Sequence, residues 1–97
     1  MLFIARMTVE FSESLSPEEI REYQQREKAY SAALQEKGIM KAIWRVAGQY
    51  SNYSIYNVRD HDHLHEIMTG FPMFQYMDIK IEPLSRHPNA LHYYFQE

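Results

Sequence analysis

The sequence predicts a small α+β domain in which two helices cover one face of a four-stranded antiparallel sheet. Three observations support this prediction. Four segments alternate apolar and polar residues with the period of a β-strand. Two other segments carry helix-capping signals and apolar residues spaced three and four apart. The length of 97 residues suits one domain and is too short for two.

The first strand is predicted over residues 2–11, because apolar side chains occur there at every second position. Ser16 then indicates the start of a helix, since Pro17 suits its first turn and Glu19 can complete a capping box. This helix is expected to end just before Gly38, which can adopt the left-handed conformation that commonly follows a helix.

Three more strands and one short helix complete the predicted fold. Residues 39–47 and 50–58 form the second and third strands, with a turn between them. In the second strand, alternation predicts one face with Met40, Ala42, Trp44 and Val46, and the other with Ile39, Lys41, Ile43 and Arg45. Asp60 can cap a short helix over residues 61–69, and residues 76–82 form the fourth strand.

The resulting order, β-α-β-β-α-β, is that of a ferredoxin-like domain. We expect this domain to span residues 1–88 and to be followed by a C-terminal tail, residues 89–97. Both helices cover the same face of the sheet, so the chain itself leaves the other face open. Because aromatic content is high at 14%, we expect a homo-oligomer in which a neighbouring subunit covers that face and receives the tail.

Composition excludes several classes of function. The chain has no cysteine, which rules out disulfides, a thiolate nucleophile and a cysteine-based zinc site. Its net charge of −3 argues against a nucleic-acid-binding protein. No apolar stretch reaches the roughly 20 residues of a membrane span, and the first residues lack the pattern of a signal peptide. We therefore expect a soluble, cytoplasmic protein.

One residue of the predicted first helix does not fit its apolar stripe. The stripe consists of Ile20, Tyr23, Glu27, Tyr30 and Leu34. A carboxylate at position 27 is at least partly desolvated, which raises its pKa and suits it to carry a proton near neutral pH. The alternative is a structural ion pair with Arg6 or Arg45. Tyr23 and Tyr30 either wall a pocket beside Glu27 or pack in the core.

A second polar group lies around the corner between the second and third strands. Arg45, Tyr50 and Asn52 supply a cation, a hydroxyl and an amide there. Tyr50 and Asn52 have the spacing of residues that point the same way from a strand. Donors of this kind can stabilise an oxyanion. Taken alone, the corner is better explained as a turn asparagine and a surface tyrosine.

Two further clusters are weaker. His61 and His65 lie one helical turn apart and could share a divalent ion, but no third ligand has a diagnostic spacing. We therefore predict no metal site and interpret this segment as a solvated helix start. Arg86, in the segment before the tail, either supplies a charge to a site or only orders the tail.

Taken together, a set of motifs over residues 1–88 resembles the muconolactone delta-isomerase family. The segments that carry the resemblance are Met1-Leu2-Phe3, Glu27-Lys28, Ile43-Trp44-Arg45, Gly48, Tyr50, Asn52-Tyr53-Ser54, Leu64-His65, Pro72, Phe74, Tyr76-Met77-Asp78-Ile79, Leu84 and Arg86-His87-Pro88. Three positions depart from the family pattern: Ile4, Gln49 and Gln75. The aromatic tail is also unlike the polar ends of family members.

The resemblance implies a ferredoxin-like αβ barrel that assembles as a decamer. It also implies an isomerase without metal or cofactor, which converts muconolactone to 3-oxoadipate enol-lactone in the β-ketoadipate pathway of aromatic catabolism. Glu27 would carry the proton, and Tyr50 and Asn52 would lie in the pocket. Arg45 is our first choice to bind the substrate carboxylate, with Lys28 and Arg86 as alternatives and Tyr30 as a pocket wall.

Other functions remain open at this stage. The same base could remove a proton from a chlorinated lactone and cause loss of chloride, as in the similar chloromuconolactone dehalogenases. A non-catalytic oligomeric domain that binds a small ligand belongs to a different class. Related folds also include cofactor-free monooxygenases, which consume oxygen.

Overall fold

The computed structural model describes all 97 residues. In chain order, its elements are β1 (Leu2–Val9), α1 (Pro17–Glu36), β2 (Met40–Arg45), β3 (Ser51–Asn57), α2 (His61–Thr69), a short 3₁₀ helix η1 (Phe74–Tyr76) and β4 (Met77–Leu84). The predicted β-α-β-β-α-β order is confirmed. The 3₁₀ helix before the last strand was not predicted.

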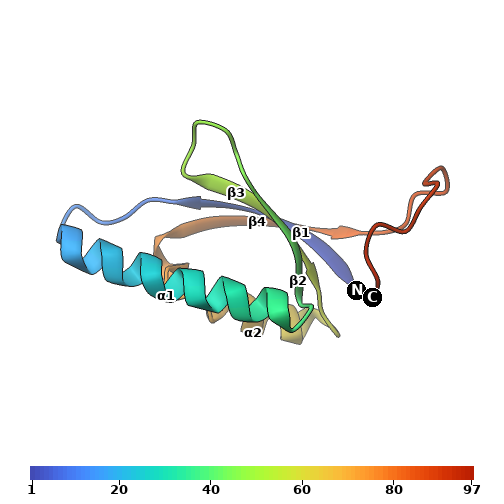
Figure 1. Ribbon diagram of the computed structural model, residues 1–97, viewed down its shortest axis with the longest axis horizontal. Helices are drawn as coiled ribbons and strands as arrows, with labels where there is room; N and C mark the ends of the chain where they lie inside the picture. Colours follow the sequence, from blue (N-terminus) through green and yellow to red (C-terminus); the bar gives the residue numbers. More distant parts are fainter.

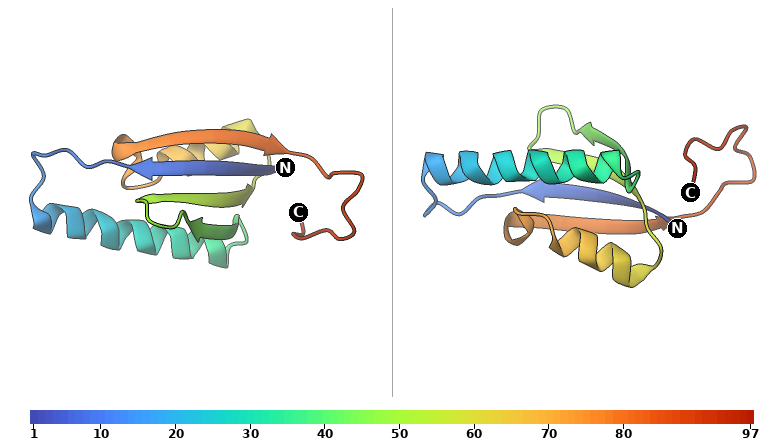
Figure 2. Two further views of the ribbon diagram at one scale, coloured as in Figure 1. Left: turned by 90° about the horizontal axis from the view of Figure 1, so that it is seen from above. Right: turned by 60° about the horizontal axis from the view of Figure 1, so that its bottom comes forward.

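The four strands form one antiparallel sheet in the order β2-β3-β1-β4. Both helices lie against the same face of this sheet (Figure 1). Helix α1 runs along the half that contains β2 and β3, and α2 along the half that contains β4 (Figure 2). This is the ferredoxin-like layering that the sequence predicts. Neither helix is long and apolar enough to cross a membrane.

Local signals set the ends of α1. The Ser16 hydroxyl accepts a hydrogen bond from the backbone N–H of Glu19, and the Glu19 carboxylate accepts one from the backbone N–H of Ser16. The predicted capping box is therefore present. Gly38 has φ +73°, a left-handed conformation that glycine adopts without strain. These two features fix the length of α1 and with it the positions of its side chains over the sheet.

The core lies between the helices and the sheet. Alternate residues of β1, Phe3, Ala5 and Met7, are buried there as predicted. They join an apolar cluster to which every other element except η1 and β4 contributes a buried residue, including Leu34, Met40, Tyr56, Leu64 and Ile67. Only 15 residues of the chain are buried, so the single chain has a small core.

The predicted faces of β2 are wrong beyond its first residue. Met40 pairs with Tyr56 and Ala42 with Ile55, so Lys41 is an extra residue in a β-bulge. The bulge shifts the alternation by one position. Ile43 and Arg45 therefore lie on the same face as buried Met40, whereas Ala42 and Trp44 lie on the opposite face. Regular alternation could not have predicted this arrangement.

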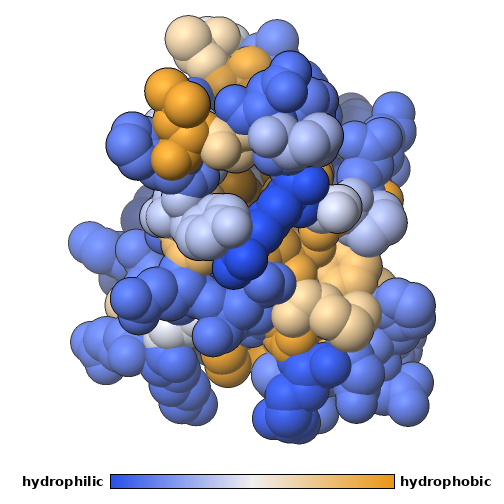
Figure 3. Space-filling model, turned by 90° about the vertical axis from the view of Figure 1, so that its right-hand side faces the viewer, coloured by the Kyte–Doolittle hydropathy of each residue, from blue (hydrophilic) through white to orange (hydrophobic).

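The face of the sheet away from the helices is uncovered. Cross-strand pairs place Ala42, Ile55 and Ile4 in one row and Trp44, Tyr53 and Arg6 in the next. Trp44 is 59% exposed. Seen from the end of the molecule where the tail lies, hydrophobic surface shows between the polar side chains (Figure 3). The open face exposes aromatic side chains, Trp44 and Tyr53 among them.

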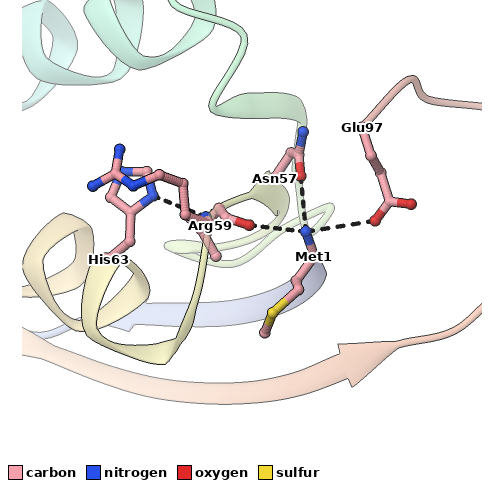
Figure 4. A network of polar contacts seen from close by, with 6 residues as sticks. Met1, Asn57, Arg59, His63 and Glu97 are labelled. Carbon is pink, nitrogen blue, oxygen red and sulfur yellow. Dashed lines mark hydrogen bonds and ion pairs between the residues drawn. The ribbon is translucent and has the colours of Figure 1, made fainter.

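The tail lies beside the first residue of the chain and remains largely exposed. The Met1 ammonium group donates to the Asn57 side chain and the Val58 carbonyl, and lies 3.6 Å from the Glu97 carboxylate (Figure 4). Leu91 and Tyr94 are 89% and 75% exposed. The tail therefore contributes little to the core of its own chain.

Candidate active site

A cavity of about 370 Å³ lies between α1 and the sheet. Five of the seven predicted site residues line it: Glu27, Lys28, Arg45, Tyr50 and Asn52. The apolar part of its wall includes Met7, Met40, Phe71 and Met73, which also belong to the buried interior. The structure thus brings together polar residues from the helix and from the strand corner that lie far apart in the sequence.

Helix α1 presents one polar stripe to the cavity. Gln24, Glu27, Lys28 and Ser31 all line it, at the i, i+3, i+4 and i+7 spacing of one helical face. This stripe lies beside the apolar one predicted from the sequence. Glu27 belongs to both stripes, because it lies at the boundary between the core and the cavity.

The Glu27 carboxylate is enclosed without a partner. Both of its oxygens are buried, and neither accepts a hydrogen bond. Burial raises the pKa of Glu27 from 4.5 to about 7, and the nearby backbone N–H of Met73 only partly opposes this shift. No basic side chain forms an ion pair with Glu27, since the one ion pair of the chain joins Met1 and Glu97.

The ion-pair interpretation of Glu27 is therefore wrong. Arg6 lies on the open face of the sheet, where it donates to the Tyr53 hydroxyl and the Gln49 side chain. Arg45 lines the cavity but is not in contact with the carboxylate. Glu27 is a desolvated acid that faces a cavity, and this is the arrangement that suits a proton carrier.

Three residues of the strand corner face Glu27 from the sheet side. Arg45 pairs with Asn52 across β2 and β3, and the bulge in β2 turns Arg45 to the helix side, where Asn52 already points. The Arg45 guanidinium lies over the Tyr50 ring, 5.1 Å from its centroid. The side-chain oxygen of Asn52 is buried without a hydrogen-bond partner. The corner therefore provides a cation, a hydroxyl and an unsatisfied amide around one space.

Tyr56 also lines the cavity and was missed in the sequence. It is fully buried, and its hydroxyl accepts a hydrogen bond of 2.8 Å from Ser54. Burial, and to a lesser extent the charge of Glu27, raises the pKa of Tyr56, so its hydroxyl stays protonated. The period of two through Tyr50, Asn52, Ser54 and Tyr56 could have indicated it.

Two predicted site residues lie outside this cavity. Tyr30 packs its ring edge-on against Phe71, with centroids 4.7 Å apart, and its hydroxyl donates to the Ile67 carbonyl at 2.7 Å. Tyr30 thus ties α1 to α2 and does not wall the pocket. Arg86 follows β4 and lies over the Tyr93 ring of the tail, 3.7 Å from its centroid. Neither residue is placed to touch a ligand in the cavity.

The histidine segment has a structural arrangement. Asp60 caps α2 by accepting a hydrogen bond from the backbone N–H of His63. The His63 ring accepts one from the backbone N–H of Arg59 (Figure 4). His61 and His65 do not come together with a third His, Cys, Asp or Glu in a group that could hold a metal ion.

Comparison with known proteins identifies the family. The muconolactone delta-isomerase family model matches residues 1–90. The chain belongs to this family. Muconolactone Delta-isomerase 1 of Acinetobacter lwoffii is 47% identical over 91 residues, which cover 94% of this chain and 95% of that protein. Muconolactone Delta-isomerase of Rhodococcus opacus is 48% identical over 86 residues, covering 89% and 92%.

A solved structure agrees with the family assignment. A crystal structure of muconolactone isomerase superposes with a TM-score of 0.91 at 35% sequence identity, covering 99% of this chain and 100% of that chain. The family resemblance predicted from the sequence motifs is thus confirmed. The three positions that depart from the family pattern, Ile4, Gln49 and Gln75, all lie outside the lining of the cavity.

The burial of Glu27 predicts a pH-dependent stability difference. Because the folded-state pKa is raised, the unfolded chain releases its proton near pH 4.5 while the folded chain keeps it to about pH 7. The free energy of unfolding of the wild type therefore decreases as the pH rises from about 4.5 to about 7. We expect Glu27→Gln to be more stable than wild type at pH 8.5 by about 1–2 kcal/mol, a value reduced for partial solvation of the side chain.

Urea denaturation at fixed protein concentration measures this difference. The advantage of the variant should shrink as the pH approaches 4.5, the ordinary pKa of the group. Glu22→Gln is the matched control, because Glu22 is exposed on the same helix. Equal stability profiles for both variants would contradict the prediction, and a large loss of stability in Glu27→Gln would indicate a buried partner.

Proposed function

We propose that this chain is a muconolactone delta-isomerase that acts without metal or cofactor. It shifts the ring double bond of muconolactone to give 3-oxoadipate enol-lactone, a step of aromatic catabolism in the β-ketoadipate pathway. The observation that carries the proposal is the buried, unpaired carboxylate of Glu27 in a cavity that also contains Arg45. Family membership supports the substrate class.

The reaction is a proton transfer between two ring carbons. In muconolactone, the ring C–H beside the carboxymethyl arm is acidic, because the anion is conjugated with the lactone carbonyl. Glu27 removes this proton, and the electron pair moves through the ring to give a dienolate. The same carboxyl group then returns the proton to the carbon next to the carbonyl. No atom is gained or lost, so no co-reactant is needed.

The environment of Glu27 suits both half-reactions. A carboxyl group with a pKa of about 7 is ionised often enough near neutral pH to take the proton and basic enough to hold it. Its oxygens are shielded from solvent, which limits loss of the carried proton to water. With one carboxyl group as the carrier, the proton leaves and re-enters on the same face of the ring.

The other polar residues of the cavity have distinct roles in this proposal. The Tyr50 hydroxyl and the Asn52 amide donate to the lactone oxygen as negative charge develops there. Arg45 binds the carboxylate arm of the substrate, and Lys28 adds positive charge at the same cavity. Tyr30 and Arg86 have no part in the mechanism, because they lie outside the cavity.

Replacing the proton carrier should abolish most turnover. Glu27→Gln keeps the shape of the side chain but cannot accept a proton, so we expect kcat to fall by at least about 10²-fold. In wild type, kcat/KM should rise with pH and level off above about pH 7, as Glu27 becomes ionised.

Steady-state assays of muconolactone isomerisation over a range of pH test both statements. Glu22→Gln should retain wild-type kcat. A folded, fully active Glu27→Gln variant would remove Glu27 from the mechanism. Assays of a chlorinated lactone, with detection of chloride, distinguish isomerisation from the dehalogenase alternative.

Substitution of Arg45 and of Arg86 tests which arginine binds the carboxylate arm of the substrate. Arg45→Ala should raise KM by about 10–100-fold with a smaller effect on kcat, because the charge binds ground and transition states alike. Arg86→Ala should leave KM unchanged, since Arg86 stacks on the tail. A fall in kcat alone for Arg45→Ala would place Arg45 at the developing oxyanion. No effect at all would assign the arm to Lys28.

We also propose that the protein works as a homodecamer in the cytoplasm, and that residues 89–97 dock on a neighbouring subunit. The support is the open sheet face with exposed Trp44, together with a tail whose Leu91 and Tyr94 have little cover in their own chain. A stable assembly would bury this surface. The decamer is the number that the family resemblance implies.

Light scattering at micromolar concentration tests the assembly. We expect one large species for wild type and smaller species for Trp44→Glu, which introduces a charge on the open face. Gln25→Glu adds the same charge on the exposed side of α1 and should not change the assembly. A monomeric wild type would contradict the proposal. Deletion of residues 89–97 should loosen the assembly, and an unchanged oligomer would show that the tail is dispensable.

A further inference from the structure

Tyr50 reaches the cavity from the turn between β2 and β3, and side chains from three other segments hold it. The side-chain NH₂ of Gln24 on α1 donates to the Tyr50 hydroxyl at 3.0 Å. The Arg45 guanidinium lies over the ring. The Phe11 ring meets it edge-on, with centroids 6.2 Å apart and an interplanar angle of 83°. Only the contact with Gln24 involves the hydroxyl group.

The hydrogen bond from Gln24 decides what the Tyr50 hydroxyl can do. A phenol hydroxyl has one proton to donate and lone pairs that accept. Because Gln24 is the donor in this bond, it occupies a lone pair and leaves the Tyr50 proton free. No other side chain or backbone group takes that proton. Since Tyr50 lines the cavity, its proton is available to an acceptor inside it.

Gln24 lies on α1 at a position from which its side chain reaches both the cavity and the Tyr50 hydroxyl. It lies three residues before Glu27, one turn along α1, and both side chains line the cavity. A single rigid helix therefore carries the proton carrier and the residue that orients a donor opposite it. Because Gln24 and Glu27 lie on the same helix, α1 sets the distance between the Glu27 carboxylate and the Tyr50 hydroxyl.

We propose that Gln24 is a positioning residue of the isomerase, which acts through Tyr50 by directing the Tyr50 hydroxyl proton toward the lactone oxygen. This inference rests on the proposed function and deepens it. Gln24 does not touch the reacting carbon atoms. Its effect should therefore fall on kcat, where the developing negative charge is stabilised, and should disappear when Tyr50 has no hydroxyl.

Three substitutions separate this role from a structural one. Gln24→Glu keeps the length of the side chain but replaces the donor by an acceptor, which takes the Tyr50 proton away from the cavity. Gln24→Leu removes the donor without supplying an acceptor. Gln25→Glu is the matched control, because it makes the same charge change at the next position, which is exposed and outside the cavity.

Each substitution is made in wild type and in Tyr50→Phe, and kcat and KM for muconolactone are measured with the thermal midpoint. In wild type we expect Gln24→Glu to lower kcat by roughly 10–100-fold and Gln24→Leu by roughly 3–10-fold, with KM changed less than about twofold. In the Tyr50→Phe background, both effects should fall below about threefold. Gln25→Glu should match its parent in both backgrounds.

The outcomes distinguish the two levels of the proposal. An inactive wild type would overturn the proposed function and this inference with it. If wild type is active and Glu27→Gln is not, equal losses from Gln24→Glu in both backgrounds would overturn the inference alone. So would equal activities for Gln24→Glu and Gln25→Glu. If Gln24→Glu fails to fold, Gln24→Leu decides, because unchanged kcat in that variant also overturns the inference.

Discussion

The enclosure of one carboxylate between α1 and the sheet is the constraint on which the rest of the structure depends. A helix that packs on a sheet normally buries apolar residues along its inner stripe. Here Glu27 interrupts that stripe without a counter-ion, and burial raises its pKa to about 7 although the nearby Met73 backbone N–H partly opposes the shift. The neighbouring wall contains no compensating charge within contact distance. The desolvation that weakens the fold therefore also gives the proposed proton carrier a pKa near neutral pH.

The sheet separates the cavity from the uncovered surface. In β3, Asn52 and Tyr56 point toward the helices, whereas Tyr53 and Ile55 point toward the open face. A single strand thus serves the cavity with one set of residues and the uncovered surface with the alternate set. Ile4, Gln49 and Gln75 depart from the family pattern but none of them lines the cavity: Ile4 and Gln49 lie with the open face, and Gln75 bonds to Tyr23 of α1. These three departures therefore leave the residues that line the cavity unchanged.

Local signals in the sequence predicted the fold and five of the residues that line the cavity. The capping box at Ser16, the glycine at position 38 and the alternation in β1 depend only on neighbours along the chain. The polar residue in the apolar stripe of α1 likewise marked Glu27. Tertiary contacts, which local signals do not show, place Tyr30 and Arg86 outside the cavity. The Tyr30 hydroxyl donates a hydrogen bond to the Ile67 carbonyl, and the Arg86 guanidinium lies over the Tyr93 ring of the tail.

The β-bulge at Lys41 shows how one local irregularity changes the direction of several side chains. Met40 and Arg45 are an odd number of residues apart, so a regular strand would point them to opposite faces. The extra residue Lys41 reverses the alternation between them. As a result, one strand buries Met40 in the core and turns Arg45 into the cavity beside Asn52. The same reversal leaves Trp44 on the open face. With regular pairing, the cavity would contain the indole and lose its guanidinium. One irregular residue therefore links core, site and outer surface.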